Sequence, residues 1–386
     1  MIHIVDKHQC CGCTSCQVAC PQDAIEMRPD ALGFQYPVVN NDRCINCGLC
    51  EKACAFNPFY DQESHFSEPN VFAARLRDEQ ELIKSRSGGL FYALARHYIE
   101  IGGIVYGAAF NGVSEVVHKR ITTIEDLQQL RGCKYVQSNL DRVFDFIIDD
   151  LKKGRSVLFS GTGCQVAGLH SLLKTKNIND SRLILCDIIC HGVPSPYAWR
   201  EHIKYIEKKY HGTVETVNFR DKSLGWKASV SSFKLAGGQI IHSSLFNEAF
   251  INHYLNRLSC GTCYFANLKR PGDITLGDFW GIEKVKPEWF TDDKGASLVL
   301  INTHKGKMAF DSVTNELNIV ESNTEECIQL NLQKPSAVST YRENFETAFA
   351  KRGYVYAMRE YGDLSFKRLF NKKFIALKSK VKQLIR

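Results

Sequence analysis

Short apolar runs bounded by glycine alternate with helical spacing through the middle of the chain. Buried strands rich in β-branched residues are expected at residues 102–110, 156–161 and 183–192. Helices are expected over residues 126–130 and 140–154, the second ending at Gly154. This alternation predicts an α/β body built on a mostly parallel sheet that is covered on both faces.

Three turns in this body carry glycines at the start of a helix or the end of a strand. Ser87-Gly88-Gly89 precedes a helix, where free backbone N–H groups suit a phosphate. The strand–turn–helix at 157–173 holds Gly161-x-Gly163, but Val166 stands where a dinucleotide fingerprint has its third glycine. The segment 187–196 ends a strand with Cys-His-Gly. Each turn taken alone is more typical of a plain loop or helix cap.

The first 60 residues differ from this body because they contain a duplicated cysteine pattern. Cys10-x2-Cys13-x2-Cys16-x3-Cys20-Pro21 recurs as Cys44-x2-Cys47-x2-Cys50-x3-Cys54, without a proline directly after the last cysteine. This is the spacing of bacterial two-cluster ferredoxins, in which the fourth cysteine of each copy reaches the other cluster. Two [4Fe–4S] clusters are predicted, one held by Cys10, Cys13, Cys16 and Cys54, the other by Cys44, Cys47, Cys50 and Cys20. Zinc also takes four thiolates, but this spacing suits it poorly. Cys11 lies outside the pattern.

Composition supports a globular protein in a reducing compartment. The chain has 386 residues, of which 44% are hydrophobic and 24% charged, and it contains 16 cysteines. No basic segment followed by an apolar run opens the sequence and no apolar stretch reaches eighteen residues, so neither a secretory signal nor a membrane span is expected. The cysteines are therefore interpreted as metal ligands or redox groups of a cytoplasmic protein.

Charge is concentrated at the end of the chain. Eight Lys or Arg and no acid follow Asp363, and without them the net charge of +7 falls to −1, which disfavours a nucleic-acid footprint. Apolar residues recur at helical steps in this basic tail, at Phe366, Phe370, Phe374, Leu377, Val381 and Leu384. Two interpretations stay open: an interfacial helix that makes peripheral contact with the inner face of the membrane or with an acidic partner, and a solvated helix packed on the body.

A further Cys-x2-Cys lies at Cys260 and Cys263, followed by a basic pair and two Gly-Asp turns. Such a pair is redox-active, structural, or one half of a metal site. The cysteines that remain as partners are Cys133, Cys164, Cys186, Cys190 and Cys327.

Six segments together resemble the coenzyme F420 hydrogenase/dehydrogenase beta-subunit family. They read SRSGG, CKYVQS, VLFSGTGCQVAGL, CHGVPSP, FRDKSLGWK and CGTCYFANLKRPGDITLGDFWGI, and they span about residues 70–300. The resemblance implies an iron–sulfur flavoprotein oxidoreductase that uses FAD. It divides the chain into a two-cluster ferredoxin domain (1–60), a flavin-contacting region (61–150), a catalytic region (151–320) and a helical basic tail (321–386). The implied fold class is a ferredoxin-like α+β domain joined to an α/β flavin-binding body.

The resemblance also assigns residues. The flavin site is implied to include Ser87, Gly88, Gly89, Lys134, Tyr135, Ser138, Thr162, Gly163 and Gln165. A third [4Fe–4S] cluster is implied at Cys164, Cys190, Cys260 and Cys263. Related sequences commonly have Ser in place of Cys133 and Pro in place of Gly163; the second change loosens a turn but removes no ligand. His191 is a candidate proton donor, although a histidine beside a cluster ligand is more often structural.

The expected activity is an electron relay between the clusters and FAD, with reduction or oxidation of F420 or another small organic substrate. Its external donor or acceptor would be ferredoxin or F420. An alternative is an electron-transfer subunit without its own substrate site, docked on a partner oxidoreductase; ferredoxin-fused relatives resemble proteins found beside polysaccharide-synthesis enzymes. A third alternative is a redox sensor that uses Cys11 or Cys133 as an exposed thiol.

Overall fold

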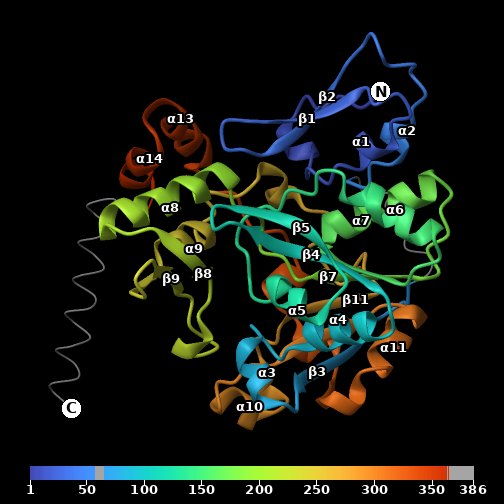
Figure 1. The fold of residues 1–386 in the computed structure, drawn as a ribbon, viewed down its shortest axis with the longest axis vertical. Helices are drawn as coiled ribbons and strands as arrows, with labels where there is room; N and C mark the ends of the chain where they lie inside the picture. The colour runs from blue at the N-terminus through green and yellow to red at the C-terminus, as the bar shows by residue number, and fades with distance from the viewer. Residues whose placement is uncertain (57–64, 363, 365–386) are drawn as a thin grey trace.

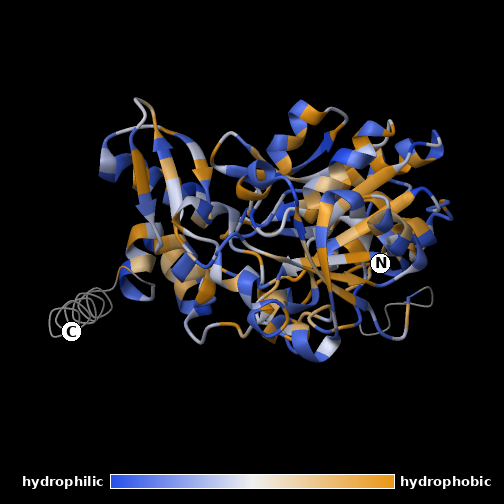
Figure 2. Ribbon diagram, turned by 90° about the horizontal axis from the view of Figure 1, so that it is seen from below, coloured by the Kyte–Doolittle hydropathy of each residue, from blue (hydrophilic) through white to orange (hydrophobic). Residues whose placement is uncertain are grey.

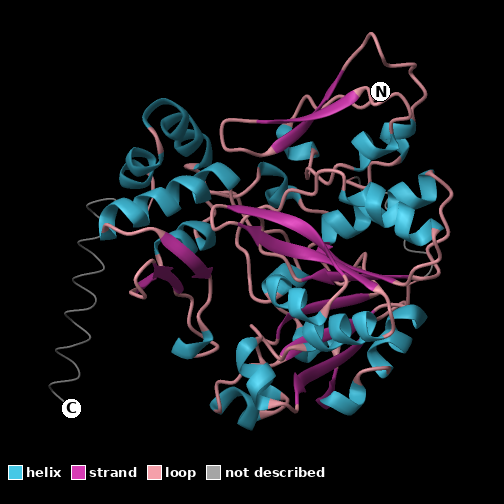
Figure 3. Ribbon diagram, in the orientation of Figure 1, coloured by secondary structure: helices cyan, strands magenta, loops and turns pink. Residues whose placement is uncertain are grey.

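Thirteen strands and fourteen α-helices form the described part of the chain (Figures 1 and 3). The computed structural model describes residues 1–56, 65–362 and 364. The tail residues from Phe366 onward and all of residues 57–64 lie outside the described residues.

A sheet of eight strands runs through the centre of the molecule (Figure 3). Its order is β13-β3-β12-β11-β7-β6-β4-β5. The strands span β3 (Asn70–Leu76), β4 (Ile104–Asn111), β5 (Glu115–Ile121), β6 (Val157–Thr162), β7 (Leu183–Ile188), β11 (Ile274–Asp278), β12 (Ser297–Ile301) and β13 (Leu317–Ser322). The expected strands at 102–110, 156–161 and 183–192 are therefore present as β4, β6 and β7.

The expectation of a mostly parallel sheet is wrong. Only β4, β6, β7 and β11 run parallel, whereas β5, β12, β3 and β13 each pair with their neighbours in antiparallel fashion. The apolar runs that identify buried strands do not encode strand direction, because a strand buried on both faces reads alike in either orientation. The result is a mixed sheet with a parallel centre.

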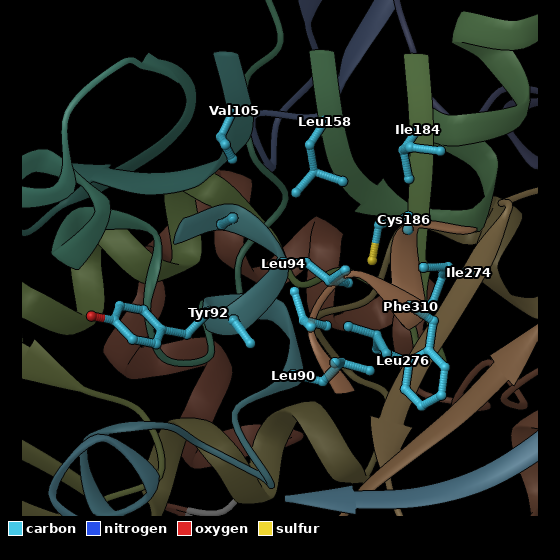
Figure 4. Close-up of a cluster of buried hydrophobic side chains, with 14 of the residues drawn as sticks. Leu90, Tyr92, Leu94, Val105, Leu158, Ile184, Cys186, Ile274, Leu276 and Phe310 are labelled. Atoms are coloured by element: carbon cyan, nitrogen blue, oxygen red, sulfur yellow. The ribbon is translucent and has the colours of Figure 1, made fainter. Parts of the chain in front are cut away.

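Helices cover both faces of this sheet, as the alternation of strand and helix predicted. On one face α4 (Leu90–Glu100) and α11 (His304–Asp311) pack over Leu158 of β6 and Cys186 of β7 (Figure 4). On the other face α6 (Val143–Lys152) and α7 (Gly163–Thr175) pack over the flanking strand residues. Alternate residues of each central strand thus pack into the cores on opposite faces of the sheet. Because both faces are buried, these strands are apolar along their length, as Figure 2 shows.

Smaller elements complete the fold. Around the sheet lie α3 (Glu79–Lys84), α5 (Ile124–Leu127), α10 (Pro287–Thr291) and α12 (Thr324–Cys327). A second lobe, seen beside the sheet in Figure 1, contains β8 (Val214–Asn218), β9 (Ser231–Leu235), β10 (Ile240–Ser243), α8 (Pro196–Tyr210), α9 (Leu245–Ile251), α13 (Arg342–Arg352) and α14 (Tyr354–Glu360). Trp199 of α8 is fully buried in its aromatic core. Among the described helices, none combines the length and apolar character needed to cross a membrane.

The N-terminal 56 residues form a small lobe at the top of Figure 1. It contains the hairpin of β1 (Ile25–Pro29) and β2 (Gln35–Val39) and two short helices, α1 (Ser15–Ala19) and α2 (Leu49–Lys52). This N-terminal lobe rests on α7, where Gly168 faces Ser15 of α1. A Cβ built on Gly168 would lie 2.8 Å from the Sγ of Cys13, which only glycine avoids. The cysteine-rich lobe is therefore packed directly on the helix that follows β6.

Candidate functional site: three cysteine quartets and a cationic cluster

The two cysteine loops of the N-terminal lobe have the same backbone conformation. Gly12 and Asn46 precede the second cysteine of each copy, and Thr14 and Gly48 follow it; all four have a positive φ, between 56° and 75°. Each loop then enters a short helix that carries the third cysteine. The repeat in the sequence is thus also a repeat in the structure. In each copy it points three thiols toward the same region.

Each loop borders a cavity. Three of the pattern cysteines that line the cavity come from that loop, and the fourth comes from the other copy of the pattern. The first cavity has about 330 Å³ of empty space and the second about 360 Å³, and both are partly open to solvent. The first is lined by Cys10, Cys13, Cys16 and Cys54, together with Cys11; the second by Cys44, Cys47, Cys50 and Cys20. These are the two exchanged sets predicted from the spacing. We call them the first and second quartets.

Four cysteines of the body form a third group, the body quartet. Cys164 opens α7 just after β6, Cys190 follows β7, and Cys260 and Cys263 lie in and directly after a 3-10 helix (Leu258–Thr262). Burial raises the pKa of Cys190, and the charges of the other three thiols raise it further. Burial likewise raises the pKa of Cys260 to about 12 and that of Cys263 to about 11. The structure therefore brings together the four cysteines that the resemblance grouped, at the carboxyl ends of two parallel strands.

Backbone and hydroxyl groups surround the body quartet. The Oγ1 of Thr162 lies 3.2 Å from the Sγ of Cys164, and the backbone N–H of Gly192 points to the Sγ of Cys190 at 3.4 Å. Hydrogen bonds to thiolates favour the charged form that a metal requires.

Among the described residues, no three His, Cys, Asp or Glu side chains converge as they would around a single metal ion.

Arg257 links the loop of the first quartet to the body through hydrogen bonds. Its fully buried guanidinium donates to the carbonyls of Cys10 (2.7 Å) and Gln35 (2.8 Å) and to the Oε1 of Gln137 (3.0 Å). It also stacks on the ring of Tyr36, 4.2 Å from the centroid. Nothing in the sequence distinguished this arginine, because its partners lie more than 100 positions away.

The glycine turn expected to contact a flavin is packed against the sheet. The hydroxyl of Ser87 donates to the carbonyl of Ala296, and the Gly88 N–H donates to the Oγ of Ser297. A Cβ on Gly88 would lie 2.0 Å from the carbonyl oxygen of Ala74 on β3. Gly89, with φ at 86°, precedes α4. The close approach to β3 by itself explains glycine at position 88.

The other expected flavin residues come from the segment 134–138 and from the start of α7. The Nζ of Lys134 donates to the carbonyls of residues 129, 131 and 132, and burial lowers its pKa to about 7. The ring of Tyr135 packs between two aromatic rings of the second lobe. Gln165 closes the capping box of α7 with Thr162 and donates to the Oγ of Ser138 at 3.1 Å. Gly163 is buried at the start of α7, where a Cβ would lie 3.0 Å from Phe265.

Sequence reasoning missed a cluster of cations that joins three of the quoted motifs. Arg86 donates to the carbonyl of Trp226, and Arg220 is paired with the carboxylate of Asp278. Lys222 donates to the carbonyl oxygens of residues 82, 85 and 87, and burial lowers its pKa to about 8. The signal was available in SRSGG, FRDKSLGWK and GDFWGI, whose charged residues were not singled out. We call Arg86, Arg220 and Lys222 the cationic cluster.

The cationic cluster has one donor without a partner among the described residues. Asp278 lies among its charges, and Arg220 and Arg86 lower the pKa of this carboxyl despite burial; the carboxylate of Asp292 also acts on Lys222. The buried Nε of Arg86 has no hydrogen-bond partner among the described residues. Trp226 and Trp280 stack beside it with ring centroids 4.8 Å apart. Guanidinium groups beside stacked indole rings are residue types that bind phosphate-bearing ligands with planar rings, and here Lys222 and Arg220 also donate to backbone carbonyls.

His191 lies between the body quartet and the cationic cluster. It follows Cys190, and its ring is close enough to Asp278 and Arg220 for both charges to act on its pKa, which burial lowers overall. No side-chain hydrogen bond of His191 is found within the described part of the chain. The role of His191 as a proton donor stays a prediction.

Two family models match the chain. Residues 154–326 match the family described as the C terminus of the coenzyme F420 hydrogenase/dehydrogenase beta subunit. Residues 9–57 match the 4Fe-4S dicluster domain.

Curated relatives match shorter stretches. The F subunit of F(420)H(2) dehydrogenase from Methanosarcina mazei is 20% identical over 196 residues, which cover 48% of this chain and 54% of the relative. Ferredoxin-type protein NapF of Haemophilus influenzae is 40% identical over 45 residues, 12% of this chain and 26% of the relative. The chain thus spans about half of the first relative and about a quarter of the second.

Among solved structures, the F420-reducing [NiFe] hydrogenase complex from Methanosarcina barkeri contains a chain that is 16% identical, with a TM-score of 0.49. The match covers 78% of this chain and 93% of that one.

Proposed function

Because residues 154–326 belong to the F420 hydrogenase/dehydrogenase beta-subunit family and residues 9–57 to the 4Fe-4S dicluster family, we propose that the chain is an iron–sulfur flavoprotein oxidoreductase. Three cysteine quartets would each hold a [4Fe–4S] cluster, and the cationic cluster would hold the phosphates of FAD. The substrate would be F420 or another small organic hydride acceptor or donor. The activity of the whole enzyme is part of this proposal.

One observation carries the proposal: the three cysteine quartets are separate and adjacent. Each N-terminal quartet surrounds its own cavity, and α7 carries Cys164 of the body quartet while packing against α1 beside Cys13. Thiolate quartets are the ligand sets of [4Fe–4S] clusters. An isolated zinc ribbon or a thiol switch would not need three such sets in contact.

The residues around the cationic cluster fit FAD. Arg86 and Arg220 would bind the pyrophosphate through planar guanidinium groups, and Lys222 would add a third charge. Lys134, Tyr135 and Ser138 would line the same site, with Thr162, Gly163 and Gln165 at its far edge. His191 would hold or release a proton between this site and Cys190. When bound, FAD accepts electrons singly and transfers them in pairs, which is the chemistry that links clusters to an organic substrate.

A second candidate function is an electron-transfer subunit without a substrate site, docked on a partner oxidoreductase. The Methanosarcina mazei relative is by its name one subunit of a dehydrogenase, which supports this candidate. The two functions differ in what the isolated chain can do, since only the first reacts with F420 unaided.

The test uses the full chain, purified without oxygen and incubated with FAD. We expect it to retain FAD and, on addition of chemically reduced F420, to oxidise it while the clusters become reduced, as followed by absorbance and electron paramagnetic resonance. Arg86→Gln should weaken FAD binding at least tenfold, equivalent to about 1.4 kcal/mol, with unchanged iron content. Lys84→Gln, which removes an exposed cation two residues away, is the matched control. FAD binding without any reaction with F420 would favour the second candidate; no flavin binding would refute the first.

A further inference from the structure

The two cysteine loops of the N-terminal lobe differ in what covers them. Cys11 in the first loop is 6% exposed, whereas Ile45 at the same place in the second loop is 61% exposed. The first loop is therefore covered and the second faces solvent, and the alternative of an exposed sensor thiol at Cys11 is wrong. The charged residue that the body places against the first loop is Arg257.

The guanidinium of Arg257 lies directly against the first quartet. Besides its hydrogen bond to the carbonyl of Cys10, it donates from Nη2 to the Sγ of Cys10 at 3.6 Å. A Cβ built on Gly12 would lie 2.7 Å from its Nη1, so glycine lets the guanidinium reach the loop backbone. The rings of Phe34 and Tyr36 flank it, with centroids 5.5 Å and 4.2 Å from the Cζ. The positive charge is thus fixed beside a predicted cluster ligand.

No carboxylate among the described residues neutralises this charge. The hydrogen bonds of the guanidinium go to two backbone carbonyls, to the side-chain amide oxygen of Gln137 and to the thiol of Cys10. Arg342, which is equally buried, is by contrast paired with Glu346 at 2.8 Å. Buried charges in proteins are normally paired. An anionic group in the first quartet would supply the missing partner, and a cluster held by four thiolates is an anion.

The second quartet is in a different electrostatic environment. In the part of the chain that the structure describes, no Lys or Arg side chain donates to its thiols; a backbone N–H, that of Ile2, donates to the Sγ of Cys50 at 3.3 Å. The ammonium group of Met1, which lines the second cavity, is paired with the carboxylate of Glu51 at 3.3 Å. An unpaired buried cation is therefore a feature of the first quartet.

We propose that Arg257 raises the reduction potential of the cluster in the first quartet. The inference rests on the proposed function, because it concerns a cluster held by these cysteines. A cluster gains one negative charge with each electron, so a nearby cation stabilises the reduced state more than the oxidised state. The hydrogen bond to the Sγ of Cys10 acts in the same direction, and burial limits screening of the charge by salt. Arg257 thereby shifts an electron shared by the two N-terminal clusters toward the first, which lies beside the body.

The experiment titrates the clusters electrochemically, with detection by electron paramagnetic resonance, in full-length chains purified without oxygen. Iron and flavin content are measured first, and Cys16→Ser identifies the signal of the first cluster by changing or removing it. Arg257→Gln should lower the reduction equilibrium constant of this cluster at least tenfold, or 59 mV for one electron. Arg257→Lys keeps the charge and should recover most of this shift. The matched control Arg342→Gln removes a buried arginine whose charge is already paired, so it should shift no potential.

Gln137→Glu tests the charge while the arginine stays in place. The carboxylate would replace the amide oxygen that accepts from the Nη1 of Arg257 at 3.0 Å, so it would pair with the guanidinium. The reduction equilibrium constant of the first cluster should again fall about tenfold. This variant decides the question if Arg257→Gln does not retain its iron.

Two results would overturn the inference. An unchanged potential of the first cluster in either variant, once that variant is loaded with iron, would show that the charge does not act on it. An equal fall in Arg342→Gln would show that the shift follows from the loss of any buried arginine. In both cases the wild-type chain would still hold its clusters and FAD, so the proposed function would stand. A wild-type chain without iron in the N-terminal quartets would instead refute both together.

Discussion

Gly168→Ala should disturb the junction between the N-terminal lobe and α7 although it adds a single methyl group. The new Cβ would lie 2.7 Å from the Oγ of Ser15 and 2.8 Å from the Sγ of Cys13, where ordinary contacts begin at 3.4 Å. Alanine by itself favours a helix over glycine by about 1 kcal/mol. Overpacking of a filled site costs about 1–3 kcal/mol, so the net loss is about 0–2 kcal/mol. We expect the upper half of this range, about 1–2 kcal/mol, because a cysteine that would hold a cluster cannot move freely.

The assay is urea unfolding of the cluster-loaded chain without oxygen, with loss of cluster absorbance as a second readout. Lys174→Ala, an exposed change on the same helix, serves as the control and should stay within about 0.5 kcal/mol of the wild type. The variant should also release iron faster than the wild type. A Gly168→Ala chain as stable as the wild type, or more stable by the helix propensity of alanine, would refute the close packing of α1 on α7.

Two further predictions concern buried polar groups. Arg257→Met leaves the carbonyls of Cys10 and Gln35 without their donor, so the free energy of unfolding should fall by about 3 kcal/mol. Proteolysis of the N-terminal lobe should become faster, and Arg257→Lys should recover part of the lost free energy. His118 is stacked on Phe159, and burial lowers its pKa to about 4. Between about pH 4 and 6.5 the unfolded state therefore binds more protons than the folded state. The stability that comes from neutral His118 is lost as the pH falls through this window. His118→Phe should flatten the pH dependence of urea unfolding there, and an unchanged slope would contradict the assignment.

The grouping of cysteines around the two N-terminal cavities could be predicted from the sequence, because three cysteines of each set lie within seven residues. The rule that the fourth cysteine of each copy serves the other copy completed the two sets, and each cavity is lined by one of them. That these sets hold clusters stays a prediction. The body quartet needed the resemblance, since Cys164 and Cys260 are almost a hundred residues apart.

The features that were not predicted depend on distant partners. The direction of β12 and β3 is set by how the chain returns to the sheet, which an apolar run does not record. Arg257 and Arg220 carry no motif of their own, and their roles come from carbonyls and carboxylates brought near by the fold. Cys11 was noticed as extra, but its burial against Cys164 required α7 to be in place. The division of the body at residue 150 stays a prediction, and both of its regions contribute strands to one sheet.

The most direct test of the account is the content of iron, acid-labile sulfide and flavin per chain, measured on the full-length protein purified without oxygen together with its absorption spectrum. Three [4Fe–4S] clusters and one flavin predict about twelve irons, about twelve sulfides and one FAD. Eight irons with no flavin after reconstitution would contradict the central claim and leave an electron carrier that holds two clusters.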